Sequence, residues 1–146
     1  MAGFALTHFG EAYILEWLCK GKLPGRLNLF LGYLTSNPGE TGTGSEVAGK
    51  GYARLKLVDV SSPTAVSVFG PVTPNIAPAT GSYCANTADL EFPMATGNQG
   101  TISHIGLWDA AAGGNMIAYK ALALPQTVLA GQQVKFPIDK LRISAD

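Results

Sequence analysis

The sequence predicts an all-β fold, an antiparallel β-sandwich or jelly roll of about eight or nine short strands with one N-terminal helix. Apolar and polar residues alternate with a period of two along most of the chain. The 18 glycines and 9 prolines favour many tight turns, and charged residues make up only 14% of the chain, against about 25% in soluble domains. The length of 146 residues fits a single domain, residues 1–146.

The helix is expected from Thr7 to Lys20, within an N-terminal helical segment of residues 1–22. Thr7 is a suitable N-cap and Gly21 a suitable C-terminal stop. Apolar residues recur every four positions and form an aromatic stripe on one face, which consists of Phe9, Tyr13 and Trp17 with Ile14 and Leu18 beside them. This stripe packs either onto the protein's own sheet or onto a neighbouring subunit, and the sequence leaves both alternatives open.

The β-sandwich is expected over residues 23–146. Its predicted strands cover residues 27–34, 52–60, 66–69, 86–92, 101–108, 116–124, 127–129, 134–138 and 141–143. The glycines of the segment 109–115 suit a hairpin loop with positive φ. A proline-rich surface arm is expected over residues 70–81.

Residues 35–51 form a long predicted loop with five glycines, one proline and almost no apolar side chains. Loops of this length in a compact domain are usually functional or disordered, so we expect partner contacts, more than self-packing, to order it. Tyr52 and Arg54 lie where the loop re-enters the sheet. We expect Arg54 to pair with a carboxylate, either Glu46 or one on a neighbouring subunit, and so to hold the loop. Glu40, Glu46, Tyr52 and Arg54 join the aromatic stripe as candidate interface residues.

The sequence does not predict an enzyme, a cofactor or a metal site. His104 lies on a strand and is expected to be structural, and the two neighbours of a Ser103–His104–Asp109 set would point to opposite faces of that strand. Two histidines without nearby ligand partners do not suit zinc. The carboxylates of Glu40 and Glu46 are too few for a calcium cage.

The charge balance and the two cysteines restrict the partners and the compartment. Ten basic residues match ten acidic ones, which argues against nucleic acid as a partner, and the N-terminal stretch resembles neither a signal peptide nor a membrane span. A surface poor in charge favours association with other proteins. Cys19 and Cys84 match no metal or redox spacing, and we expect them to be buried and unpaired.

Several motifs occur in order along the chain: the loop with its following Gly51-Tyr-Ala-Arg54, then Phe92-Pro-Met-Ala-Thr96, Gly100-Thr-Ile-Ser-His-Ile-Gly-Leu-Trp-Asp109 and Gly113-Gly-Asn115. In this combination the chain resembles a family of small bacteriophage virion proteins that are often described as tail fibre proteins. The proline-rich arm 70–81 departs from the short Ser/Gly-rich connection of that family.

The resemblance implies a structural protein of the virion, assembled in the host cytoplasm, where the cysteines stay thiols. Two positions in the particle are open. The first is a head decoration or cement protein bound to the major capsid protein. The second is a tail-fibre, receptor-binding or adaptor component that contacts other virion proteins. The chain encodes no coiled coil or repeat that would form a fibre shaft, so the sequence favours decoration. A homo-oligomer, either dimer or trimer, is expected in both cases.

Overall fold

A computed structural model of the chain describes residues 3–22, 25–73 and 82–145. The described chain is mostly β-structure with one helix, as the sequence predicts. Its elements are β1 (Ala5–Leu6), α1 (His8–Lys20), β2 (Leu29–Leu34), β3 (Leu55–Asp59), β4 (Val66–Ser67), β5 (Ser82–Ala85), β6 (Leu90–Glu91), β7 (Gly100–Trp108), β8 (Met116–Val128), β9 (Lys135–Phe136) and β10 (Arg142–Ala145). In the part of the chain that the structure describes, no helix is long and apolar enough to cross a membrane.

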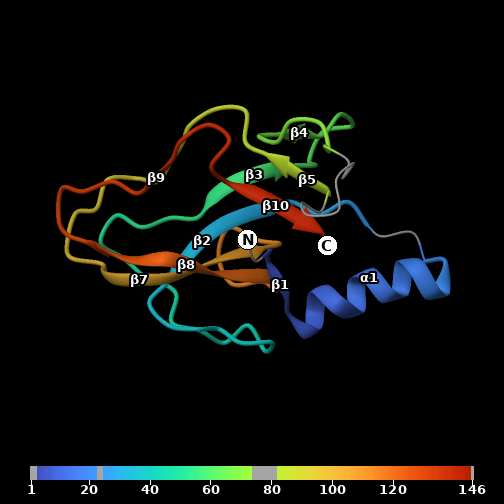
Figure 1. Cartoon of the computed structure of the whole chain (residues 1–146), viewed down its shortest axis with the longest axis horizontal. Coiled ribbons are helices and arrows are strands. Elements are labelled where there is room, and N and C mark those ends of the chain that lie inside the picture. Colours follow the sequence, from blue (N-terminus) through green and yellow to red (C-terminus); the bar gives the residue numbers. More distant parts are fainter. Residues whose placement is uncertain (1–2, 23–24, 74–81, 146) are drawn as a thin grey trace.

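One six-stranded antiparallel sheet, in the order β1-β8-β7-β2-β3-β4, forms the larger layer (Figure 1). Two short antiparallel pairs, β10-β5 and β6-β9, lie across from it. Buried side chains from both sides form one core, which includes Leu31, Tyr33, Leu57, Leu90, Phe92, Ile102, Ile105, Leu107 and Leu141. The predicted antiparallel β-sandwich is therefore confirmed.

The strongest sequence patterns give the central strands. β2 lies between β3 and β7, and its residues from Phe30 to Leu34 are all buried, which agrees with an apolar run covered on both faces. β7 and β8 form the predicted hairpin. Gly113 and Gly114 adopt the positive φ values of 60° and 69° that its loop requires, while Asp109 Oδ1 accepts a hydrogen bond of 2.7 Å from the amide of Asn115.

Several boundaries differ from the prediction. The strands expected at 116–124 and 127–129 are one strand, β8, and the strands expected at 86–92 and 134–138 shrink to two residues each in β6 and β9. Two strands were missed. β1 precedes the helix inside the expected helical segment, and β5 lies just before the strand expected at residue 86. Most of the predicted arm 70–81 lies outside the described residues; within its first part, Thr73 pairs with Tyr83.

Candidate interaction surface

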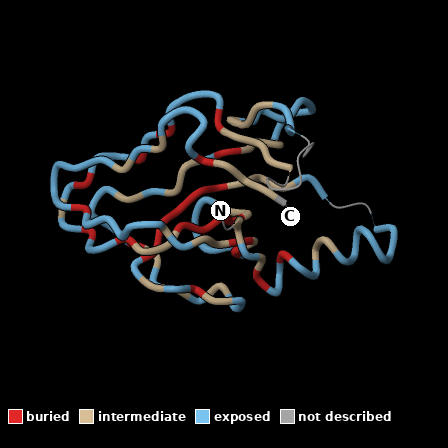
Figure 2. Tube along the Cα trace, viewed as in Figure 1, coloured by how far each residue is buried: buried red, intermediate tan, exposed pale blue. Residues whose placement is uncertain are grey.

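The helix α1 projects beyond the sandwich, and most of its residues are exposed (Figures 1 and 2). Its ends form as the sequence predicts, since Thr7 accepts a hydrogen bond from the amide of Gly10 and Gly21 ends the helix with a φ of 63°. Gly10 is the only helical residue that is buried. Apolar side chains with large exposed fractions are Phe9 (37%), Leu15 (56%), Trp17 (50%) and Leu18 (65%).

The aromatic stripe therefore does not pack onto the sheet of its own chain. Phe9 and Tyr13 stack on each other at a ring distance of 6.3 Å, and the Tyr13 hydroxyl donates to the carbonyl of Gly25. Trp17 lies farther along the helix with half of its surface exposed. Of the two alternatives left open by the sequence, packing onto the protein's own sheet is the one that the structure does not support.

The base of α1 is fixed by contacts with β8 and with the loop 35–51. A Cβ atom on Gly10 would lie 2.2 Å from the carbonyl oxygen of Ile117, so the first turn of the helix lies directly against β8. The Thr7 amide donates to this same carbonyl at 3.0 Å. From the loop, the Glu40 carbonyl accepts from the His8 amide at 2.8 Å, and the Glu40 carboxylate lies 3.1 Å from His8 Nε2. These contacts set the direction in which the helix leaves the sandwich.

The loop 35–51 is held by contacts within the chain. Thr35 N donates to Ser45 O at 2.9 Å, and Ser45 N donates to Ser36 Oγ at 2.8 Å. Pro38 and Val47 are buried. Backbone and hydroxyl hydrogen bonds within the chain therefore hold the loop where apolar packing is sparse, while the ordering of the loop by partners stays a prediction.

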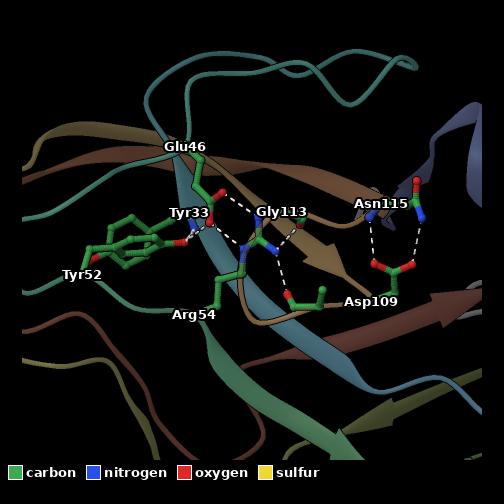
Figure 3. Close-up of polar contacts among 8 residues, drawn as sticks. Tyr33, Glu46, Tyr52, Arg54, Asp109, Gly113 and Asn115 are labelled. Atoms are coloured by element: carbon green, nitrogen blue, oxygen red, sulfur yellow. Dashed lines mark hydrogen bonds and ion pairs between the residues drawn. The ribbon is translucent and has the colours of Figure 1, made fainter.

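An ion pair between Glu46 and Arg54 secures the end of this loop (Figure 3). The pair is bidentate, with 2.6 Å from Arg54 Nε to Glu46 Oε1 and 2.7 Å from Nη2 to Oε2. The Arg54 side chain is only 4% exposed and that of Glu46 is 26% exposed. The predicted pairing of Arg54 with Glu46 is confirmed, and it is made within one chain.

Arg54 also holds the hairpin between β7 and β8. Its Nη1 donates to the carbonyl oxygens of Ala110 at 2.6 Å and Gly113 at 2.9 Å, and the guanidinium lies 4.1 Å from the ring centre of Trp108. Figure 3 shows the guanidinium between the Glu46 carboxylate and the hairpin. One buried side chain thus joins two segments that are far apart in the sequence.

Tyr52 joins the Glu46–Arg54 pair from the side of the core, and the three residues form one polar cluster. Its hydroxyl donates to Glu46 Oε1 at 2.6 Å and accepts from the amide of Tyr33 at 3.3 Å. Burial, together with the adjacent Glu46 carboxylate, raises the pKa of Tyr52 far above its usual value. A Cβ atom on Gly32 would lie 2.4 Å from the Tyr52 oxygen, so glycine at this position leaves room for the hydroxyl.

The remaining polar candidates serve structural contacts. Ser103 Oγ lies 2.8 Å from His104 Nδ1, because a β-bulge between Ile102 and His104 breaks the alternation that should have separated the two side chains. That part of the sequence argument is wrong. Asp109 does not join them, since its carboxylate accepts both hydrogen bonds from Asn115.

The cysteines and the acidic residues correspond only in part to the expectations. Cys19 and Cys84 are both free, as expected. Cys19 is exposed on α1 and Cys84 is only partly buried, so the expectation of burial is wrong for Cys19 and is met only in part by Cys84. Glu40 and Glu46 bind His8 and Arg54 respectively. Among the described residues, no three His, Cys, Asp or Glu side chains gather as metal ligands would.

Comparison with known protein families identifies a match over nearly the whole chain. Residues 5–144 match the model of the family described as Podophage GP4 fiber I protein gp80. No curated protein matches the chain. The matched range contains α1, the loop 35–51, the Glu46–Arg54 pair and the hairpin 109–115, so it includes the candidate interaction surface. The chain therefore belongs to the family of the podophage GP4 fiber I protein gp80, a family of phage virion structural proteins.

Proposed function

We propose that the protein is a non-enzymatic component of a phage tail fibre, and that it attaches to a neighbouring virion protein by inserting α1 into an apolar pocket of that partner. The observation that carries this proposal is the exposed apolar surface of α1. Aromatic anchors in a partner's pocket dominate interface energetics, typically at ~2 kcal/mol or more for each one truncated.

The geometry of α1 suits an anchor. Isolated helices shorter than about 12–15 residues are marginal in water, so the 13 residues of α1 depend on their caps and on the contacts of the first turn. Those contacts occupy only its N-terminal end. Trp17 and Leu18, half or more exposed, lie at the free end, where a partner can surround them without disturbing the sandwich.

A structural role also fits the use of the charged groups. The buried guanidinium and the carboxylate of Glu46 bind each other, and the Asp109 carboxylate holds the hairpin through Asn115. These groups join segments of the fold. They give the protein a rigid base from which the helix projects.

The family description supports the tail fibre over the capsid decoration that the sequence favours. The absence of a shaft-forming repeat from the chain restricts the role within a fibre to an adaptor or a tip. An adaptor must bind at least one other virion protein, and α1 supplies a surface for this contact.

The test compares two exposed side chains of α1 with one exposed leucine outside the helix. Leu18→Ala and Trp17→Ala truncate the free end of α1, whereas Leu129→Ala truncates a leucine that is 47% exposed outside the helix. We expect all three isolated variants to unfold at nearly the wild-type temperature, because substitutions at exposed positions usually change stability by less than about 0.5 kcal/mol. In virions produced with each variant, the helix variants should dissociate at lower temperature than Leu129→Ala.

Equal retention of Leu18→Ala, Trp17→Ala and Leu129→Ala on virions would contradict the proposal. Loss of stability in the isolated helix variants would show instead that the stripe belongs to the protein's own core. Thermal unfolding of the purified variants and quantification of the protein on heated particles separate these outcomes.

A further inference from the structure

A cleft opens between β8 and the segment 132–136, at the end of the sandwich away from α1 (Figure 1). Its volume is about 760 Å³, within the range of about 300–1,000 Å³ that is typical of small-molecule sites. The buried side chains of Tyr33, Ile102, Ile105 and Val128 form its floor. Because protein interiors contain few voids larger than a water molecule, a cleft of this size is a candidate ligand site.

An irregularity of β8 shapes the cleft. The pairing of β8 with β7 jumps from Ala121 to Gln126, and residues 122–125 form a bulge opposite Ser103. The first three residues of this bulge line the cleft. Bulges often occur beside binding sites, where they redirect side chains that a regular strand would place elsewhere.

The walls of the cleft offer no free charge to a ligand. From Ala121 to Val134 the chain contains no charged residue. Among the described residues that line the cleft, only Lys135 is charged, and its ammonium group binds Asp89 at 2.9 Å and Glu91 at 3.2 Å. A charged ligand would therefore lose its hydration without gaining a free counter-charge.

Three glutamines give the rim of the cleft an uncharged polar character. Gln132 Oε1 accepts a hydrogen bond from a backbone amide at 2.8 Å, and Gln133 Nε2 donates one to a backbone carbonyl at 2.8 Å. Gln126 Nε2 donates a longer bond of 3.4 Å to the carbonyl of Leu124. In the described part of the chain, no hydrogen bond occupies the other end of these carboxamides. The rim thus presents one donor group and two acceptors, held in place by the backbone, and a hydroxyl or amide group can pair with both kinds.

We propose that this cleft binds an uncharged amphiphile. The aliphatic or aromatic part of the ligand lies on the floor, and its hydroxyl or amide head group lies at the glutamine rim. The apolar floor and the uncharged polar rim are two separate zones, which matches the two parts of such a molecule. A peptide added as a strand would need regular main-chain pairing along β8, which the bulge interrupts. The site lies apart from α1 and goes beyond the attachment proposed for that helix.

Three compounds with the same alkyl chain test the proposal, because octyl glucoside is uncharged, octyl sulfate is anionic and octylammonium is cationic. Each is titrated below its micelle concentration into the full-length protein, and methyl resonances are followed by NMR. We expect octyl glucoside to bind saturably and to shift the methyl resonances of Ile102, Ile105 and Leu122. The two charged compounds should bind about tenfold more weakly or worse, because their charge stays unpaired at the rim.

Two exposed positions of the cleft give variants, and circular dichroism checks that each variant is folded. Ala123→Trp places a large side chain in the cleft and should abolish binding of octyl glucoside, whereas Leu129→Trp, outside the lining, should not. Gln126→Arg adds a cation to the rim and should make octyl sulfate bind more tightly than it binds the wild type. The gain expected from Gln126→Arg keeps the test decisive even where Ala123→Trp disturbs folding.

Four results would overturn the inference. These are equal affinity for the three compounds, shifts confined to residues of α1 such as Leu15 and Leu18, unchanged binding of octyl glucoside by folded Ala123→Trp, and no saturable binding by the wild type. The last result would favour a side chain of a virion partner as the occupant of the cleft. Retention of the α1 variants on virions does not depend on the cleft, so the attachment proposed for α1 is tested separately.

Discussion

Replacing Arg54 by methionine should strongly destabilise the protein, because this one side chain joins the loop 35–51 to the hairpin 109–115. The substitution keeps most of the apolar stem but removes the guanidinium. It abolishes both bonds of the bidentate pair with Glu46 and the bonds to the carbonyls of Ala110 and Gly113. It also removes the stacking on Trp108.

The magnitude follows from burial. Breaking a buried ion pair by removing one partner destabilises by about 3–5 kcal/mol, since the remaining charge stays uncompensated. The Glu46 side chain keeps 26% exposure, so water screens part of this charge and the lower half of the range applies. We therefore expect about 3–4 kcal/mol, or a melting temperature lower by about 10 °C for a chain of this length.

Arg142→Met provides the matched control. Arg142 also pairs with a carboxylate, that of Asp139, and lies 4.6 Å from the ring centre of Tyr83, but its side chain is 38% exposed. Exposed pairs contribute little to stability, because water screens them. Urea unfolding of both variants gives the comparison, and an Arg54→Met variant that loses no more stability than Arg142→Met would refute the reasoning.

Three further predictions concern the surroundings of this cluster. Burial and Glu46 raise the pKa of Tyr52, so the folded protein keeps this proton when the unfolded chain ionises above about pH 10, and stability falls as the pH rises. In urea titrations above pH 10, Tyr52→Phe should reduce the fall of the unfolding free energy with pH by up to about 1.4 kcal/mol per pH unit. An unchanged pH dependence would contradict the raised pKa of Tyr52. Glu46→Gln combined with Arg54→Met should destabilise by less than the sum of the two single variants, whereas additive values would exclude coupling. Deleting residues 41–44 should leave the sandwich folded but accelerate amide hydrogen exchange in α1, because the loop clamps its base through Glu40; unchanged exchange would count against the clamp.

The sequence predicts those parts of the fold whose signals are local. Thr7 and Gly21 mark the ends of α1 because caps depend on single residue types. The apolar run of β2 and the long β-type segment of β7 give strands that are long enough to be recognised from their residues. β1 has two residues and cannot show a period, so only its pairing with β8 reveals it.

The contacts of Arg54 were predicted only in part, again because only some of them leave a signal in the sequence. Glu46 and Arg54 are charges of opposite sign eight residues apart, on the two sides of the loop exit, and their pairing was expected. Their bonds to Ala110 and Gly113 were not, because backbone carbonyls leave no signal in the residue types. The periodicity of α1 shows which side chains share a face but not what covers them. The position of β1 beside β8 likewise depends on strand order, which the sequence does not reveal.

The copy number of the protein in purified virions tests the central claim most directly. Quantitative mass spectrometry against the major capsid protein gives this number, and gold-labelled antibodies in electron micrographs give the position. As a tail-fibre component, the protein should be present in a handful of copies, all of them at the tail. Hundreds of copies distributed over the head would contradict the account and identify the protein as a capsid decoration.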